Sequence, residues 1–215
     1  MKKVLGLCVA LSLSFCAIAW GEEGKEKSKK WDWDWFLGAN VKKIELQNIK
    51  GWLVGPELKG RVVMKDYRAF IEGKAFYGVG DVNVKKNWDF WSWEEKDTLK
   101  EFYLEGKMKY FVLSDLSANF AVGLRKFELS EEGKRGNEKY AKGGVSYYLT
   151  LPHNLQFEFS PFLKFTKIDF EQKESKTAIG GQIGVFLPKN KGKISLFYEK
   201  LGENKETGIN LQVRY

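Results

Sequence analysis

The chain has 215 residues, of which 43% are hydrophobic and 30% are charged, and its formal net charge is +8. Its length favours one domain, and after the first twenty residues no apolar run approaches the ~18 residues of a transmembrane helix. It has no phosphate-binding glycine loop, His/Cys metal spacing, calcium-loop pattern or RNA-binding motif, so we expect no cofactor, no metal ion and no nucleic acid as partner.

Residues 1–19 are typical of a secretory signal peptide. Two lysines precede an apolar run, and Ala17-Ile18-Ala19 resembles a cleavage site. Cleavage there removes both cysteines of the chain, so the mature protein is expected to hold no disulfide and no thiolate nucleophile. Residues 20–30 are mostly charged, and we expect them to form a disordered polar leader.

The rest of the chain contains ten segments in which apolar and polar residues alternate with a period of two. This is the pattern of β-strands that have one apolar face. The stretch 41–52 also has some helical spacing, which leaves the end of the first strand open. In chain order the ten segments are 34–41, 52–64, 69–80, 101–112, 117–125, 139–151, 155–165, 177–187, 193–200 and 206–215.

The connections between these segments differ in length. Residues 65–68, 114–117, 152–154 and 188–192 look like tight turns, whereas 81–97, 129–138 and 169–175 look like longer polar loops. Short turns at one end and long loops at the other are typical of outer-membrane barrels. A soluble ligand-binding barrel alternates too, with its apolar face inward. Aromatic residues near the strand ends favour the membrane interpretation, because interfacial girdles use them: Trp35, Trp52, Tyr77, Phe102, Tyr110, Phe157, Phe165 and Tyr215.

The alternation continues to the last residue, in the terminal stretch INLQVRY. Together with the signal peptide, this makes residues 31–215 resemble bacterial outer-membrane β-barrels, broadly the small OmpA/OmpX type. The resemblance implies a closed, antiparallel, up-and-down transmembrane β-barrel in the outer membrane of a Gram-negative bacterium. It also implies that Tyr215 is the C-terminal signal that the barrel assembly machinery binds during insertion. Abundant Glu and Lys hint at a thermophilic source.

The pattern predicts ten strands, with eight as the alternative, because eight is the number of the small type. An even number places both ends of the barrel domain on the side of the short turns. The last strand can then pair with the first and leave no open edge, as a membrane barrel requires.

The charged faces are expected to line the lumen. Tight turns fix the register: if Met64 faces Ala69, then Arg61 faces Glu72, and a turn that sets Leu113 opposite Ser117 places Glu105 opposite Arg125. We predict ion pairs among Arg61, Glu72, Glu105, Arg125, Lys59, Lys74, Lys107, Glu158 and Lys164. The same faces carry bulky aromatic residues, so the lumen should be narrow or blocked. A small basic excess would bias any residual water path toward anions.

Two further features invite functional interpretations. Trp88, Phe90, Trp91 and Trp93 cluster in the longest predicted loop, where they could pack on the rim, dip into the outer leaflet, or bind a sugar or a partner. The chain has one histidine, His153, in a tight turn on the side of the termini, away from the outer leaflet. We therefore expect no catalytic residue and no enzyme activity.

The sequence thus predicts an integral outer-membrane barrel with a structural or surface-interaction role and a filled lumen. A narrow, weakly anion-preferring, porin-like channel is the second candidate, and an outer-leaflet lipid-modifying enzyme is the third. The expected partners are outer-membrane lipid, the assembly machinery, and a small anionic solute or surface ligand.

Overall fold

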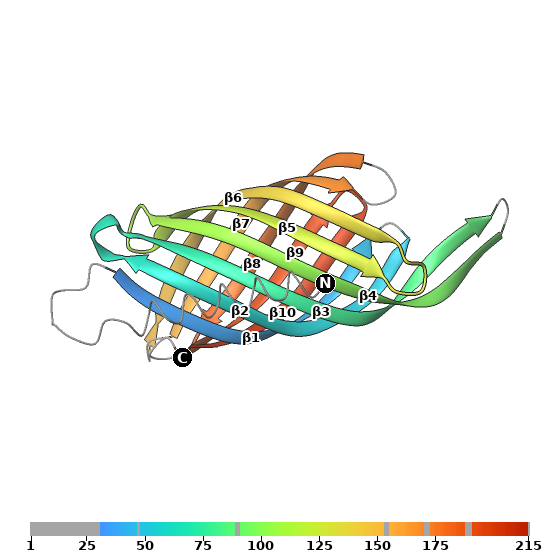
Figure 1. Ribbon diagram of the computed structural model, residues 1–215. Helices are drawn as coiled ribbons and strands as arrows, with labels where there is room; N and C mark the ends of the chain where they lie inside the picture. The colour runs from blue at the N-terminus through green and yellow to red at the C-terminus, as the bar shows by residue number, and fades with distance from the viewer. Residues whose placement is uncertain are drawn as a thin grey trace.

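The alternating segments form ten antiparallel strands that close into a barrel (Figure 1). The computed structural model describes residues 31–46, 48–88, 91–152, 155–169, 173–187 and 191–214. Each strand pairs with its neighbour in the chain, and β10 pairs with β1 to complete the ring. The strands are β1 (Trp31–Leu46), β2 (Ile49–Met64), β3 (Ala69–Trp88), β4 (Trp91–Phe111), β5 (Leu116–Leu129), β6 (Arg135–Leu151), β7 (Leu155–Asp169), β8 (Lys173–Phe186), β9 (Gly192–Leu201) and β10 (Asn204–Arg214).

The ten-strand prediction is therefore confirmed for the described part of the chain. Several predicted features lie outside the described residues: the signal peptide and leader in residues 1–30, Phe90, His153 and Tyr215. Among the described residues, no helix is long and apolar enough to cross a membrane.

The two faces of the strands have the orientation that the alternation predicted. Apolar side chains point outward and are exposed, for example Leu37 at 49% and Ile183 at 51%. Charged side chains point into the lumen and are buried, for example Glu57 at 1% and Glu158 at 2%. Such an inverted arrangement, with an apolar outer belt, suits a barrel that has lipid as its solvent.

The barrel has two unlike ends. At one end, the terminal end, the described chain begins at Trp31 and finishes at Arg214. At the other end, β3 and β4 rise above their neighbours as a two-stranded ribbon (Figure 1). β2 pairs with β3 only as far as Val84, and β5 pairs with β4 only as far as Leu99. We call residues 85–88 and 91–98 the ribbon and this side of the barrel the ribbon end.

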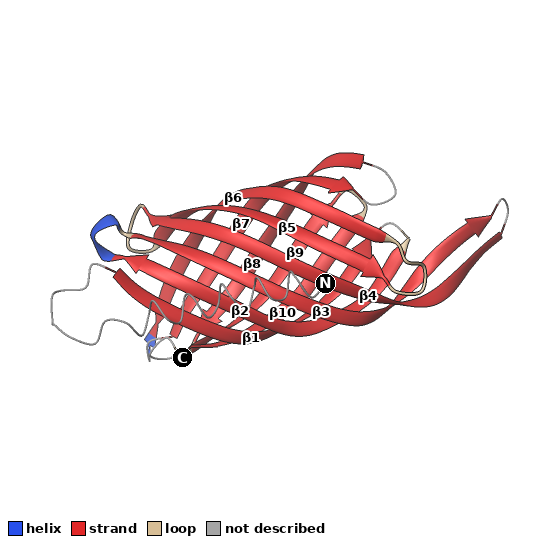
Figure 2. Ribbon diagram, viewed as in Figure 1, coloured by secondary structure: helices blue, strands red, loops and turns tan. Residues whose placement is uncertain are grey.

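Long loops were predicted at the ribbon end, and this prediction is wrong. Most of residues 81–97, 129–138 and 169–175 are strand, as Figure 2 shows for the ribbon. The ladder hydrogen bonds of a strand do not need an apolar face, so a strand continues where both faces are polar and the alternation fades. For the same reason, the stretch with helical spacing after residue 41 is strand up to Leu46.

The predicted register is correct for one turn and wrong for another. Arg61 faces Glu72, as expected. Between β4 and β5, however, Arg125 faces Tyr103, and Glu105 faces Gly123. The turn comprises residues 112–115, where the N–H groups of Val112 and Leu113 both donate to the carbonyl oxygen of Leu116, at 3.0 and 3.1 Å. This wider turn shifts the pairing by two residues.

Candidate functional site in the lumen

Four charged side chains cross the lumen toward the ribbon end, and we call them the charge ring: Lys42 of β1, Glu101 of β4, Arg125 of β5 and Glu206 of β10. Lys42 binds Glu101, and Glu101 lies 2.8 Å from Arg125. Arg125 lies 2.8 Å from Glu206, which lies 3.1 Å from Lys42. The contacts therefore form a closed cycle that links opposite walls of the barrel.

The charge ring continues into a second group of ion pairs on the β6–β9 side. Glu138 lies 3.3 Å from Arg125 and 2.6 Å from Lys164. Lys164 also lies 2.6 Å from Glu199. Buried charges are costly unless each one is paired and hydrogen-bonded, and this continuous network meets that requirement.

A small cavity of about 150 Å³ lies in the lumen beside the charge ring, and we call it the central cavity. Its lining is strongly polar. Lys74 lies 3.1 Å from Glu57, and Lys142 lies 2.8 Å from Glu105. Lys107 also lines this cavity and has no ion-pair partner among the described residues. The central cavity is thus a polar chamber in which, within the described part of the chain, Lys107 makes no ion pair although it stands opposite Glu72 in the β3–β4 ladder.

Toward the terminal end, the lumen is filled by a second barrier, the terminal plug. Its charged part is Glu158, which binds both Lys109 and Lys193. Its aromatic part packs against these charges: the ring centroids of Phe111 and Tyr148 are 5.7 Å apart. Phe70 and Phe186 extend this aromatic contact on either side. Because charges and rings fill the same cross-section, no wide pore passes through this level.

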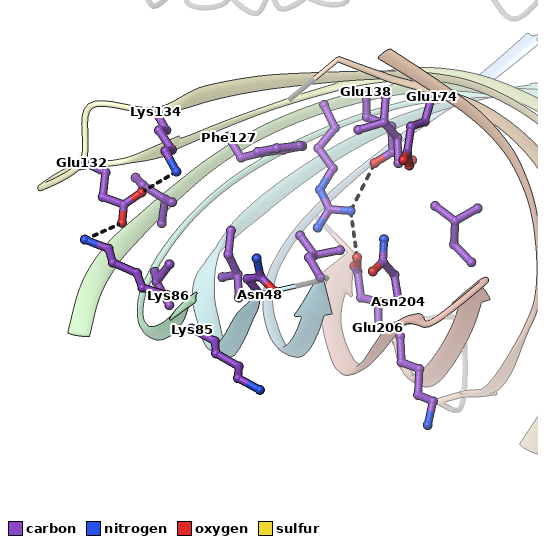
Figure 3. Close-up of a pocket in the computed structure, with 18 of the residues that line it drawn as sticks. Asn48, Lys85, Lys86, Phe127, Glu132, Lys134, Glu138, Glu174, Asn204 and Glu206 are labelled. Atoms are coloured by element: carbon purple, nitrogen blue, oxygen red, sulfur yellow. Dashed lines mark hydrogen bonds and ion pairs between the residues drawn. The ribbon is translucent and has the colours of Figure 1, made fainter. Parts of the chain in front are cut away.

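At the ribbon end, the lumen opens into a cavity of about 610 Å³, which we call the vestibule (Figure 3). One wall, from β2, β3 and β5, is apolar and contains Ile49, Val84 and Leu129, which belong to a buried cluster. The opposite wall carries acidic and amide groups, and Arg125 and Glu206 of the charge ring form part of the floor. The vestibule is therefore amphipathic and has a charged floor.

The ribbon is tied to the vestibule wall by Glu132, which lies between Lys86 and Lys134 at 3.1 Å from each (Figure 3). Burial raises the pKa of Glu132, but the two ammonium groups outweigh this effect and lower its pKa below the usual value. Hydrogen bonds to Glu95 and Glu132 raise the pKa of Lys86. The attachment is thus an ion pair at neutral pH.

The predicted cluster of loop aromatics is not a loop cluster. Trp88 and Trp91 face each other in the backbone ladder at the tip of the ribbon. Trp91 is 79% exposed, and Trp93 is 42% exposed and donates from Nε1 to Glu95 at 2.9 Å. The polarity of residues 81–97 suggested a loop, but the strands of a projecting ribbon have two polar faces as well. Of this set, Trp93 lines the vestibule.

The predicted lumen residues all lie on the inner face, but among the described residues the two predicted pairs do not form. Arg61 donates from Nε at 2.9 Å to Asp34, which faces it in the β1–β2 ladder instead of the β2–β3 ladder. Glu72 lies 3.6 Å from Lys59, diagonally across the β2–β3 ladder. The register of one ladder alone therefore does not identify ion-pair partners, because each strand has two neighbours and long side chains also reach diagonally.

Sequence reasoning missed four important lumen charges: Lys42, Glu138, Lys193 and Glu206. Each lies at or beyond the end of a segment that the apolar pattern defined. The sequence did contain the information, because each of the four lies an even number of residues from the other lumen-facing residues of its strand. Extending the alternation past the last apolar residue would have included them.

Comparisons with known proteins support the fold only. No protein-family model matches the chain, and no curated protein matches it. Among solved structures, the β domain of the Bordetella autotransporter BrkA matches 85% of this chain and 99% of its own, with a TM-score of 0.57 and 9% identity. The chain has the fold of a bacterial outer-membrane β-barrel.

Two other solved structures resemble this barrel less closely. The translocator domain of the autotransporter NalP from Neisseria meningitidis covers 100% of this barrel's chain and 97% of its own, with a TM-score of 0.48 and 10% identity. OmpT expressed in the outer membrane of Vibrio cholerae matches 88% of this chain and 99% of its own, with a TM-score of 0.33 and 7% identity.

The described residues of the barrel contain no group of three His, Cys, Asp or Glu side chains that could hold a metal ion.

Proposed function

We propose that this protein resides in the outer membrane as a closed, non-enzymatic barrel that presents a binding surface at its ribbon end. The observation that carries the proposal is the charge ring, in which Arg125 and Glu206 meet at 2.8 Å across the lumen. A barrel whose lumen is crossed by paired, buried charges is poorly suited to passive diffusion. Its exposed features are the ribbon and the vestibule.

The belt of outward apolar residues supports membrane residence, because about 25 Å of apolar surface is what an outer-membrane barrel presents to lipid. We place the ribbon end outside the cell, since both ends of the described barrel lie at the other end. In that orientation the vestibule opens to the exterior.

The vestibule favours an amphipathic surface ligand. Its apolar wall can accept a hydrocarbon or an aromatic group, whereas its floor offers charged groups. Arg125 Nε at this floor is buried and has no hydrogen-bond partner among the described residues. A ligand with an apolar body and an acceptor group would suit both features.

Swelling of proteoliposomes tests the closed lumen. Vesicles that contain the refolded full barrel are diluted into isotonic arabinose or sodium gluconate, and a general porin in the same lipid serves as the positive control. We expect swelling no faster than in protein-free vesicles. Rapid swelling in arabinose would contradict the proposal.

A narrow channel is the second candidate, because Lys107 leaves the central cavity with a cation that makes no ion pair among the described residues. Such a channel would prefer anions. A reversal potential in a potassium chloride gradient that shows preference for chloride, with no swelling in arabinose, would favour this candidate over the closed barrel.

A further inference from the structure

A row of lysines encircles most of the outer face, at the ribbon end of the apolar belt. In seven strands, the outward residue next to the last apolar one is a lysine: Lys43 follows Val41, Lys50 precedes Trp52, Lys100 precedes Phe102, Lys126 follows Leu124, Lys139 precedes Ala141, Lys167 follows Phe165, and Lys200 follows Tyr198. We call these seven residues the lysine collar. In β3, β8 and β10 the corresponding residues are Asp81, Thr177 and Thr207.

Most of the collar lacks acidic partners. Lys43 binds Glu45 at 2.7 Å. The other six make no ion pair with any described residue. Glu45 and Glu128 stand opposite Lys50 and Lys100 in the ladders, but Glu45 binds Lys43, and Glu128 lies 3.2 Å from Arg135. The collar is therefore a band of excess positive charge.

Two pairs of lysines face each other directly on this surface. Lys139 of β6 stands opposite Lys167 of β7, and Lys200 of β9 stands opposite Lys205 of β10. The second pair is partly relieved, because Lys205 also stands opposite Glu45 of β1. All four lysine side chains are exposed. Like charges directly opposite in an antiparallel ladder repel and destabilise the sheet, since their Cβ atoms are only about 5 Å apart. An anion between the two ammonium groups would remove this repulsion.

Among the described residues, the terminal end has no such collar. There the outward residues remain apolar up to the strand ends, as at Trp31, Tyr110, Leu151, Leu155 and Val213. The charge therefore distinguishes the two sides of the membrane. Its height is also defined, because the collar adjoins aromatic residues such as Trp52 and Phe102, the type that occupies the headgroup region.

We propose that the lysine collar binds phosphate groups on the headgroups of lipids in the leaflet at the ribbon end. A phosphate offers several acceptor oxygens and can bridge two ammonium groups. The opposed pair Lys139 and Lys167 is the strongest single site, with Lys126 on the adjacent strand. The proposal rests on the membrane placement given above, but not on the closed lumen.

Reconstituted barrels can test the collar. The full barrel is placed in nanodiscs of digalactosyldiacylglycerol, an uncharged lipid without phosphate, that contain lipid A either with both phosphates or after their enzymatic removal. Retained lipid A is measured by native mass spectrometry, and barrel melting by heat-dependent gel migration. The test variant is Lys139→Gln/Lys167→Gln. The control variant, Lys96→Gln/Lys191→Gln, removes the same charge from exposed positions outside the collar.

Each lysine near an anionic headgroup should raise apparent affinity about fivefold, so the test variant should bind phosphorylated lipid A about 25-fold more weakly than the parent. The control variant should bind like the parent. The melting temperature gives a second measurement, because the difference between the test variant and the parent should depend on whether lipid A carries phosphate. The test variant should melt below the parent with phosphorylated lipid A, and at or above it with dephosphorylated lipid A, where the lysine repulsion is unrelieved.

Equal binding by the two variants, or equal binding of both forms of lipid A by the parent, would overturn the proposal. Inorganic phosphate that stabilises the parent as strongly as phosphorylated lipid A would overturn the assignment to lipid. Failure of the parent to enter nanodiscs of uncharged lipid would instead contradict the membrane barrel itself.

Discussion

Arg125 and Glu206 stand on strands that are five apart in a ring of ten, yet their side chains lie 2.8 Å apart. β5 and β10 are thus on opposite walls, and this ion pair spans the full width of the lumen. Arg125 is also bound by Glu101 and Glu138 on the strands at either side. One cation therefore organises three carboxylates at the floor of the vestibule.

Replacement of Arg125 by Met should destabilise the barrel strongly. It would leave Glu101, Glu138 and Glu206 with too few cations, and removing one partner of a buried ion pair costs about 3–5 kcal/mol. Urea unfolding of the barrel in lipid vesicles would measure the change. The matched control is Arg135→Met, because Arg135 is exposed and its loss should cost less than about 0.5 kcal/mol. Equal effects of the two substitutions would contradict a structural role for the charge ring.

Replacement of Val122 by Arg tests the outward face. Val122 lies in the middle of β5 and is exposed on the apolar belt. An arginine at the middle of a lipid-facing surface costs about 2–4 kcal/mol, which the same urea titration would detect. Ser92→Arg, on the exposed ribbon, should change stability little. A neutral effect of Val122→Arg would show that this face does not contact lipid.

Replacement of Glu132 by Gln should release the ribbon, because it removes the carboxylate between Lys86 and Lys134. Hydrogen exchange of the ribbon should become several-fold faster, whereas Glu131→Gln, one residue earlier, should leave it unchanged. Exchange that is equally fast in both variants would show that the ion pair does not hold the ribbon.

The same attachment should depend on pH in a defined direction. The pKa of Glu132 is lowered in the folded protein, so its contribution is present above the usual glutamate pKa and is lost as the pH falls through the lowered value. Ribbon protection, corrected for intrinsic exchange rates, should therefore survive at pH 5 and disappear only in stronger acid. Loss of protection between pH 7 and pH 5 would contradict this assignment.

The architecture was predictable from sequence because a barrel with an apolar outer belt and a charged lumen requires a strict alternation. Every second residue of a strand has to be apolar where it faces outward, as at Leu37, Val122 and Ile183. The ribbon was not predictable in this way, since beyond the apolar belt neither face of its two strands has to be apolar. The apolar pattern therefore ended before the strands did.

The lumen was predictable in kind but not in detail. Glu105 and Arg125 were correctly placed on the inner face, but a turn wider than expected moved their register by two residues. Only half of the charge ring could be derived from neighbouring strands, because Glu101–Arg125 joins β4 with β5 and Lys42–Glu206 joins β1 with β10. The other two contacts join β1 with β4 and β5 with β10, and such cross-lumen pairs depend on barrel width and side-chain length.

The central claim is that paired charges close the lumen, and conductance in planar lipid bilayers tests it most directly. The purified full barrel is added to one side, and current is recorded at both voltage polarities, with an open porin as the control for insertion. The closed barrel should give no discrete current steps, or rare small steps that favour anions over cations. Large, stable, cation-selective steps from the unmodified protein would contradict the closed lumen.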